Sequence, residues 1–324
     1  MTVRANKPAF NVREKLKELE RPIGVKGNEL MRAETAQDAR DLVSAGRKNL
    51  LINGSFQIWQ RSTDYDNSGG GWGYYAADRY RTNRSRTRQV TATVDGREVK
   101  ALEISPGAGG YDGGRGILQK VEDYKIYNKV TTLSVYVKSN VPAQALFGSI
   151  WNTGAGTSVP NSGKIINTTT EFQKFEITNP SFDPSTSPDT YIITNLTDGV
   201  TYTIANAQLE YGKNATDFEY RSYGEELLLC QRYYYQTPSH YHFLHKNGYY
   251  ESQLFYFPTT MRAVPDVTTP TAIIRAVNGS SNISYTGFYT GRFTDGFYVG
   301  SSTTNNNSFH TFIFAGVITA DAEL

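Results

Sequence analysis

The feature that most constrains this fold is a change in hydrophobic period near residue 49. From there on, apolar residues recur at every second position in short stretches, as Leu133, Val135 and Val137 do within 132–138. Successive side chains of a strand point to opposite faces, so this pattern is typical of half-buried antiparallel strands. We therefore predict a mainly β chain from residue 49 onward.

Composition and turn signals extend this prediction to two β domains. The chain has 23 Tyr, 16 Phe and 29 Gly residues, which suits aromatic strands joined by tight turns. Asp-Gly pairs at 95–96, 198–199 and 295–296 are turn signals. We predict a jelly-roll β-sandwich of about eight strands over 49–222 and a smaller C-terminal β-sandwich over 223–324. The expected strands include 90–94, 132–138, 172–177, 190–196, 200–212, 251–257, 271–277 and 309–317.

Residues 1–48 have a different, charged and helical pattern. The stretches 11–21 and 34–46 repeat small or apolar residues at spacings of three and four, which predicts two short N-terminal helices. Helices this short need a partner in water. The partner of each helix is the other helix, a further copy of the chain, or a docking surface. The alternative interpretation is a loose arm with nascent helix.

The segment at 49–62, NLLINGSFQIWQRS, joins these two patterns and is called the opening segment below. It comes directly before the stretches in which apolar residues alternate, so we predict that it forms the first strand of the first β domain. We expect Ile52, Phe56 and Ile58 in the core, and Trp59 with them. The pair Asn53-Gly54 predicts a turn or bulge.

Charge and cysteine content exclude several classes of protein. The formal net charge of +2 is too near neutral to indicate a nucleic-acid partner. The single cysteine, Cys230, excludes an intrachain disulfide and a four-cysteine zinc site. The N-terminus lacks the apolar run of a signal peptide, and no stretch approaches the ~20 apolar residues of a membrane span. We expect no cofactor and no membrane insertion.

No motif predicts an enzyme. The sequence has no G-x-S-x-G, no H-E-x-x-H and no phosphate-binding glycine loop. Glycoside hydrolysis needs two carboxylates at a spatial separation that sequence spacing does not define. Asp64, Asp66, Asp78 and Asp112 lie near aromatic loops, and we interpret them as solvated loop carboxylates.

Aromatic residues in polar loops predict glycan contacts. Sugar binding uses aromatic rings at a concave site together with amide and carboxylate groups. The loop from Tyr65 to Tyr75 is rich in Gly and aromatic residues, and Trp151 precedes an Asn and a Gly-rich turn. The alternative is packing of these rings on the sheet or on a neighbouring subunit. The candidate glycan contacts are Trp72, Tyr74, Tyr75, Trp151 and Asn152.

Five arginines within 79–88 form what we call the arginine stripe. If the stretch is a strand, Arg84, Arg86 and Arg88 share one face. Such a face could meet phosphate or acidic sugars of a bacterial envelope. The alternative is a solvated face or salt bridges to a neighbour. The stripe consists of Arg79, Arg81, Arg84, Arg86 and Arg88.

Several segments resemble bacteriophage tail-fibre and receptor-binding proteins. The similarity includes GRKNLLINGSFQIWQRS, YYAADRY at 74–80, FPTTMRAVPDVT at 257–268 and the terminal ITADAEL. Its most specific part is IANAQLEYGKNATDFEYRSYGEELLLCQRYYYQ at 204–236, and ETAQDARDLVSAG resembles the helical lead-in of such proteins. The match covers roughly 33–324, and its motifs are structural rather than catalytic.

This resemblance implies a homotrimeric virion protein at the exterior of a phage, made in the host cytoplasm. Residues 1–48 would join other tail or adaptor proteins of the virion. The first β domain would be similar to carbohydrate-binding jelly rolls and would recognise host-surface polysaccharide during adsorption. The alternatives are a capsid decoration or fibre adaptor without receptor binding, and a polysaccharide depolymerase.

Histidines at 240 and 242 suggest a metal site only in such a trimer. H-x-H places two imidazoles on one side of a strand, and one chain supplies too few ligands for a closed site. Three chains would bring six imidazoles from His240 and His242 to a threefold axis. The alternative is exposed loop histidines.

Overall fold

The computed structural model divides the chain into two compact units, Met1–Lys48 and Asn49–Leu324. The predicted helices at 11–21 and 34–46 lie outside the described residues, and the boundary predicted at residues 222–223 stays a prediction. The structure describes residues 48–74, 76–107, 115–121, 129–148, 150–152, 157–158, 163–179, 188–237, 242–246, 251–269, 272–276, 282–285, 288–301, 309–314 and 317–323.

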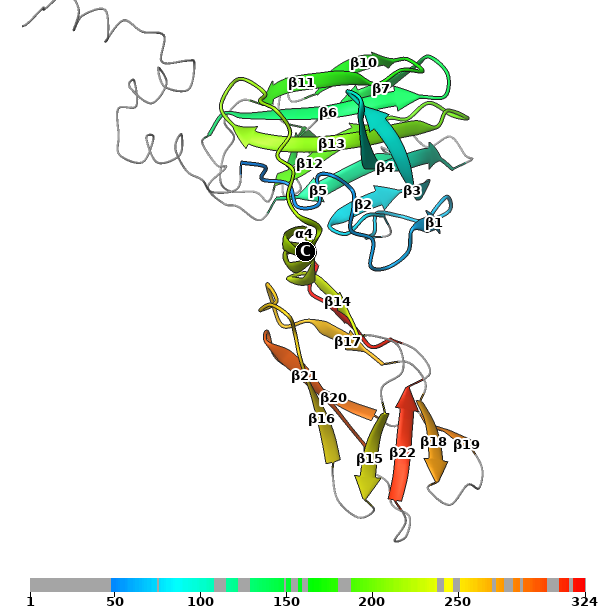
Figure 1. Cartoon of the computed structure of the whole chain (residues 1–324). Coiled ribbons are helices and arrows are strands. Elements are labelled where there is room, and N and C mark those ends of the chain that lie inside the picture. Colours follow the sequence, from blue (N-terminus) through cyan, green and yellow to red (C-terminus); the bar gives the residue numbers. More distant parts are fainter. Residues whose placement is uncertain are drawn as a thin grey trace, which may run out of the picture. The chain divides into compact units, whose positions relative to one another are not determined.

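Two antiparallel sheets form a sandwich in the first part of the second unit (Figure 1). The first sheet has six strands in the order β1-β3-β4-β13-β6-β11. These are β1 (Asp64–Asp66), β3 (Ser85–Val94), β4 (Arg97–Pro106), β13 (Tyr202–Tyr211), β6 (Thr131–Ser139) and β11 (Gln173–Asn179).

The second sheet has seven strands, five of them in the order β10-β7-β12-β5-β2. Strand β8 pairs with β12 and with β9 beside this path. The strands are β10 (Lys164–Thr168), β7 (Ala143–Phe147), β12 (Pro188–Thr194), β5 (Gly116–Lys120), β2 (Tyr80–Asn83), β8 (Ile150–Asn152) and β9 (Thr157–Ser158).

One hydrophobic core fills the space between the two sheets. The first sheet contributes buried residues such as Leu102, Val135 and Ile204, and the second contributes Ile117 and Phe147. Their spacing follows the alternation in the sequence, which puts one face of each strand inward. The predicted mainly β fold with a jelly-roll sandwich is confirmed.

The Asp95-Gly96 pair forms the hairpin turn that the sequence predicts. It joins β3 to β4, and Val94 pairs with Arg97 across it. Both turn residues have positive φ, 49° for Asp95 and 75° for Gly96. Positive φ at both central residues defines the two-residue turn whose twist matches that of paired strands.

The opening segment is not a strand, so that prediction is wrong. The structure shows bends and a turn there, with φ of 60° at Asn53 and 53° at Phe56. Asn53 Nδ2 donates to the carbonyl of Ile58 (2.8 Å), and Asn53 Oδ1 accepts from the Ile58 N–H (3.0 Å). These side-chain bonds close a local turn where a strand would need a continuous ladder of backbone bonds.

The side chains of the opening segment nevertheless reach the core. Phe56 and Ile58 are buried, and Trp59 packs against the main core, as predicted. Ile52 is only half-buried, whereas its neighbour Leu51 is fully buried. The turn predicted at Asn53-Gly54 is confirmed.

One helix within the described residues, α4 (Tyr223–Gln231), follows the sandwich. Its N-cap is Ser222, whose hydroxyl accepts from the Glu225 N–H (3.3 Å). Two glutamates in the first turn, Glu225 and Glu226, suit the positive end of the helix dipole. No helix in the described part of the chain is long and apolar enough to cross a membrane.

Three small antiparallel sheets follow α4 (Figure 1). The first joins β14 (Tyr234–Gln236), β23 (Thr319–Asp321) and β17 (Asp266–Thr268). The second joins β15 (His242–Lys246), β22 (Phe309–Phe314), β18 (Ala272–Ala276) and β19 (Asn282–Tyr285). The third joins β16 (Glu251–Tyr256), β21 (Gly296–Ser301) and β20 (Phe288–Arg292).

A second, smaller core joins the first and third of these sheets. It includes Phe255 and Phe297 from β16 and β21, together with Ala320 from β23. The rings of Phe255 and Phe297 are stacked, with centroids 4.9 Å apart. The predicted smaller C-terminal β-sandwich is therefore present, and the strands expected at 251–257, 271–277 and 309–317 correspond to β16, β18 and β22.

We predict that Gly54→Ala lowers the free energy of unfolding by about 1–3 kcal/mol, the cost of overpacking a dense interior. A Cβ at Gly54 would collide with the backbone carbonyl oxygen of Ala207 in β13. Urea unfolding measures the change. Gly71→Ala is the matched control, because a Cβ at Gly71 meets no atom within 4 Å. Equal effects of the two substitutions would contradict the close approach of the opening segment to β13.

Candidate functional site

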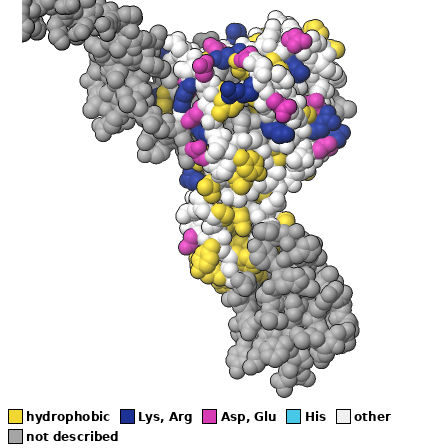
Figure 2. All heavy atoms as spheres, viewed as in Figure 1, with side chains coloured by type: hydrophobic (Ala, Val, Ile, Leu, Met, Phe, Trp, Pro, Cys, Tyr) yellow, Lys and Arg dark blue, Asp and Glu magenta, His cyan; other side chains and the backbone are white. Residues whose placement is uncertain are grey.

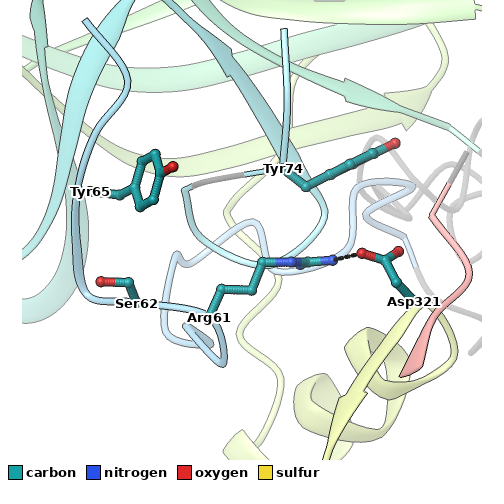
Figure 3. A pocket seen from close by; sticks show the side chains of 5 residues that line it. All are labelled: Arg61, Ser62, Tyr65, Tyr74 and Asp321. Atoms are coloured by element: carbon teal, nitrogen blue, oxygen red, sulfur yellow. Dashed lines mark hydrogen bonds and ion pairs between the residues drawn. The ribbon is translucent and has the colours of Figure 1, made fainter. Parts of the chain in front are cut away.

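A pocket of about 630 Å³ is lined by Arg61, Ser62, Tyr65, Tyr74 and Asp321 (Figure 3). Two phenol rings, one hydroxyl, one guanidinium and one carboxylate thus face the same space. Four of these residues lie within fifteen positions of one another, and the fifth comes from the last described strand. The pocket therefore exists only where the C-terminal sheet meets the sandwich.

Backbone pairing places the two tyrosines. Tyr65 lies in β1, opposite Thr87 of β3. Tyr74 follows Gly73, whose N–H donates to the Thr82 carbonyl (3.1 Å) and whose carbonyl accepts from the Thr82 N–H (2.9 Å). Both rings thus start from backbone that is tied to a neighbouring strand, which limits their movement.

Asp321 reaches the pocket from the other end of the sequence. It belongs to β23, the middle strand of its sheet, which is paired on one side with β14 and on the other with β17. Its Oδ1 accepts from the Glu323 N–H (2.9 Å). Its side chain is 43% exposed, so the carboxylate remains accessible to solvent.

Arg61 contacts the Asp321 carboxylate and two tyrosine rings. Its Nη2 donates to Asp321 Oδ2 (3.0 Å), and its Nη1 lies 3.6 Å from Glu323 Oε1. Its guanidinium carbon lies 3.6 Å from the ring centroid of Tyr234 and 5.8 Å from that of Tyr74. Because two carboxylates and an aromatic face hold this side chain, its position is defined before any ligand arrives.

A buried ion pair lies next to the pocket. Arg79 and Glu323 have side chains only 1% and 4% exposed, and Arg79 Nη1 donates to Glu323 Oε2. Arg79 Nη2 also donates to the Lys120 carbonyl (2.9 Å), and its guanidinium stacks 3.4 Å from the Tyr233 ring. Burial raises the pKa of the Glu323 carboxyl, although Arg79 and Arg61 oppose this shift.

Asp78 holds the opening segment beside this pair. Its Oδ1 accepts from the Gln60 N–H (2.9 Å), and its Oδ2 accepts from Gln60 Nε2. The same Nε2 donates to the Tyr234 carbonyl (3.0 Å) in β14. Burial raises the pKa of the Asp78 carboxyl. Gln60 therefore links the sandwich to the C-terminal sheet one residue before Arg61.

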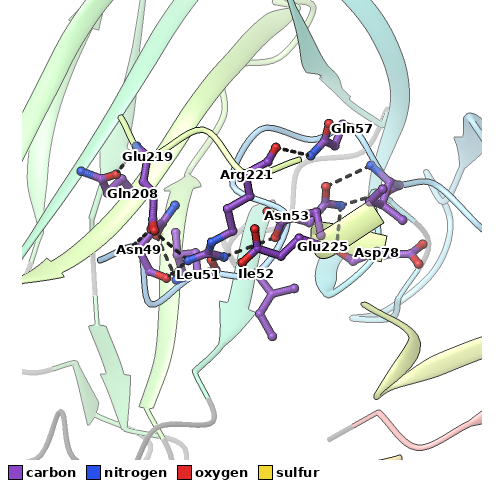
Figure 4. Close-up of polar contacts among 12 residues, drawn as sticks. Asn49, Leu51, Ile52, Asn53, Gln57, Asp78, Gln208, Glu219, Arg221 and Glu225 are labelled. Carbon is purple, nitrogen blue, oxygen red and sulfur yellow. Dashed lines mark hydrogen bonds and ion pairs between the residues drawn. The ribbon is translucent and has the colours of Figure 1, made fainter. Parts of the chain in front are cut away.

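A second polar network joins the opening segment to the start of α4 (Figure 4). Arg221 Nη1 donates to the Leu51 carbonyl (3.1 Å), and Nη2 donates to the Asn49 carbonyl. Arg221 also pairs with Glu219 (3.1 Å) and with Glu226 (3.4 Å). These bonds satisfy carbonyls of a buried segment that forms no continuous ladder with a strand. Its backbone bonds to β13 are those from the Leu50 N–H to the Leu209 carbonyl (2.8 Å) and from the Ala207 N–H to the Gly54 carbonyl (2.9 Å).

Glu226 completes this network from the first turn of α4. Its Oε1 accepts from the Asn53 N–H, and the residue is only 3% exposed. Burial raises the pKa of the Glu226 carboxyl. The helix thus carries a buried acid that bonds to the turn of the opening segment.

The structure brings one predicted glycan residue, Tyr74, into the pocket. Trp72 is half-buried and is not among the five lining residues. Tyr75 lies outside the described residues. Two residues of the predicted loop, Tyr65 and Tyr74, therefore line the pocket.

Trp151 and Asn152 lie in β8, where they pair with Asp189 and Pro188 of β12. Their side chains lie outside what the structure describes, and neither residue lines the pocket. Their role as glycan contacts stays a prediction.

The histidine hypothesis also stays a prediction. His240 lies outside the described residues, and the backbone of His242 lies in β15, opposite Ile313 of β22. Among the residues that the structure describes, no group of three or more His, Cys, Asp or Glu side chains could hold a metal ion.

The arginine stripe is divided rather than continuous. Arg79 is buried, and Arg84, with φ of 45°, lies between β2 and β3. Arg86 and Arg88 share a face of β3, and each pairs within the chain. Arg86 Nη2 lies 2.6 Å from Asp64 Oδ2, and Arg88 Nη2 lies 2.6 Å from Glu103 Oε1. Both arginines pair with acids of the same chain. Arg86 and Arg88 are therefore held in intrachain salt bridges at the surface and do not form a free basic stripe.

Sequence reasoning missed Arg61, Ser62 and Asp321 as pocket residues. The first two end the opening segment, and Asp321 lies in the terminal ITADAEL stretch. Both stretches stood out in the sequence, but nothing in their spacing relates positions about 260 residues apart. The tertiary structure brings them together through the Arg61–Asp321 ion pair and the bond from Gln60 to the Tyr234 carbonyl of β14.

No protein-family model and no curated protein matches this sequence. Partial likenesses to solved structures exist. Arabinose-bound MgGH51 α-L-arabinofuranosidase shares 17% identity at a TM-score of 0.36, over 51% of this chain and 26% of that one. The enzymatically active domain of bacteriophage CBA120 tailspike protein 4 shares 14% identity at a TM-score of 0.33, over 50% of this chain and 21% of that one.

A carbohydrate-binding module is matched over its whole length. The CBM22-1 xylan-binding domain of Paenibacillus barcinonensis Xyn10C shares 17% identity at a TM-score of 0.33, over 53% of this chain and 100% of that domain. This chain spans about a quarter or less of the arabinofuranosidase and tailspike chains. At these identities and scores, the likenesses carry no argument about function.

We predict that Glu323→Gln lowers the free energy of unfolding by about 3–5 kcal/mol, because it leaves the buried Arg79 charge without its counter-ion. The double variant Arg79→Met/Glu323→Leu should regain most of this loss, since apolar groups can replace a buried pair. Urea unfolding of the two variants measures both effects.

Glu103→Gln is the matched control, because Glu103 pairs with Arg88 at the surface, where such pairs contribute at most about 1 kcal/mol. If Glu323→Gln lowered the free energy of unfolding no more than Glu103→Gln does, the buried pair would not stabilise the junction, by which we mean the contact between the sandwich and the C-terminal sheet.

We predict that Glu226→Gln reduces the dependence of stability on pH. The folded-state pKa of Glu226 is raised, so its contribution is complete below the unfolded value of about 4.3 and is lost as pH rises through the folded pKa. The free energy of unfolding, measured from pH 4 upward, should therefore fall less steeply in the variant. Glu225→Gln, on the exposed side of the same helix turn, is the control and should keep the wild-type slope of unfolding free energy against pH. The same slope in the wild type and both variants would contradict the prediction.

Proposed function

We propose that this chain is a tail-fibre subunit of a phage virion that binds host-surface polysaccharide through the pocket lined by Tyr65 and Tyr74. The observation that carries the proposal is the pocket itself, where two aromatic rings face a carboxylate and a guanidinium. Sugar sites combine such rings with a few fixed hydrogen-bonding groups. The resemblance of residues 204–236 to phage receptor-binding proteins supports the virion assignment.

The groups in the pocket suit binding rather than hydrolysis. Two-carboxylate glycoside hydrolysis places a second acid opposite the first across the scissile bond. Of the five residues that line the pocket, only Asp321 is an acid, and it is paired with Arg61. We therefore propose a non-enzymatic recognition protein.

Attachment and assembly complete the proposal. Residues 1–48 would join the tail of the virion, and three copies of the chain would form one fibre. A single pocket with one exposed ring gives weak binding, but three linked copies gain avidity without any new contact. A rigid β scaffold with loops at its edge suits this use.

We predict that Tyr65→Ala and Tyr74→Ala each reduce binding of labelled protein to host cells by at least about tenfold, since aromatic truncation at a site removes the stacking surface. Tyr256→Ala is the matched control, because Tyr256 is 71% exposed and does not line the pocket. Binding is measured by pull-down with host cells and with virions that lack fibres.

Binding of wild type to fibre-less virions but not to cells would replace the proposal with an adaptor role. Release of oligosaccharide from host polysaccharide would instead show a depolymerase. Wild-type cell binding by both tyrosine variants would move recognition away from this pocket.

A further inference from the structure

The guanidinium of the pocket is already neutralised by the protein. Arg61 lies 3.0 Å from Asp321 and 3.6 Å from Glu323, and its side chain is only 15% exposed. An arginine that recognises a sugar carboxylate or phosphate presents a free edge for two parallel hydrogen bonds. Arg61 uses its Nη2 on Asp321 and rests its flat face on Tyr234. It is therefore poorly placed to recruit an anion.

The more exposed of the two charged groups in the pocket is a hydrogen-bond acceptor. The Asp321 side chain is 43% exposed, and its two oxygens each accept one bond, from Arg61 and from the Glu323 N–H. A carboxylate has about four acceptor positions, so two remain for hydroxyl donors. Arg61 offsets the charge of Asp321, but the carboxylate is the more exposed member of the pair, 43% against 15%, so an acidic sugar would approach the negative side of the pair.

Most of the arginines near the pocket are paired with carboxylates of the same chain. Arg79 is paired with Glu323, and the arginines of β3, Arg86 and Arg88, are paired with their own carboxylates. The guanidinium of Arg81, which is not a lining residue, lies 5.6 Å from the Tyr74 ring centroid. On the face shown in Figure 2, basic and acidic side chains are interspersed over the sandwich.

We infer that the pocket selects neutral sugar rings, which stack on Tyr65 and donate hydroxyl hydrogen bonds to Asp321, and that it rejects uronic-acid and phosphorylated or sulfated sugars. This inference rests on the proposed function and adds the class of glycan to it. Stacking needs no charge on the ligand, and Tyr65 is 38% exposed. Like charges placed together at an interface are costly, so Asp321 acts as a specificity-determining residue.

The test is binding of the full chain to a glycan array that carries neutral oligosaccharides beside uronate-containing and sulfated analogues of the same backbones. Wild type should bind at least one neutral glycan and should bind its acidic analogues at least about tenfold more weakly. The affinity for the neutral glycan should change less than about twofold between 50 and 500 mM salt, because no charge on the ligand is screened.

Asp321→Asn should narrow the gap between neutral and acidic analogues to less than about threefold, since the amide removes the repulsion. Asp198→Asn is the matched control. The Asp198 side chain is 65% exposed and pairs with Arg115, an arginine that is mostly buried. Asp198 does not line the pocket. This variant should keep the wild-type selectivity. Thermal unfolding of both variants checks that each remains folded.

The outcomes separate this inference from the proposed function. Tighter binding of acidic analogues, with affinity that falls as salt rises, would overturn the inference and leave polysaccharide recognition standing. Selectivity that is unchanged in Asp321→Asn would also overturn it. No binding to any glycan, and none to host cells, would overturn both.

Discussion

The buried ion pair between Arg79 and Glu323 is the interaction on which the junction of this protein depends. Two charges that water barely reaches are stable only when each stays beside the other, so the end of the chain is held against the sandwich. Backbone pairing with β14 and β17 holds β23 in its sheet, and the ion pair at Glu323 lies two residues from Asp321, which contacts Arg61. The pocket is therefore a consequence of how the last strand docks.

Shared groups couple the pocket to the junction. Arg61 contacts both Asp321 in the pocket and Glu323 in the buried pair, and Gln60 bonds both Asp78 and the Tyr234 carbonyl. The same residues that line the pocket therefore also hold the C-terminal sheet against the sandwich.

Most of the β architecture could be predicted from the sequence, and the pocket only in part. Alternation within 132–138 and 200–212 predicted β6 and β13, because alternation is typical of strands. The structure buries β13 on both faces from Tyr202 to Glu210, which the alternation did not predict. The opening segment misled the same reasoning, since its apolar residues do reach the core. It bonds to the backbone of β13 at Leu50 and Gly54 but forms no continuous ladder, and the side chains of Asn53 and Arg221 supply further hydrogen bonds. Tyr74 was found because an aromatic ring in a glycine-rich loop is unusual; Asp321 gave no such signal.

What the sequence by itself determined is local: the period of two, the Asp95-Gly96 turn, and the aromatic loop that contains Tyr65 and Tyr74. Each follows from the conformational preferences of neighbouring residues, which act within a few positions along the chain. Only the tertiary structure decided which charges meet. It buried Arg79 against Glu323, paired Arg86 and Arg88 with acids, and thereby turned an apparently basic stripe into a balanced surface. Ion pairing depends on distance in space and on exclusion of water, and sequence spacing specifies neither.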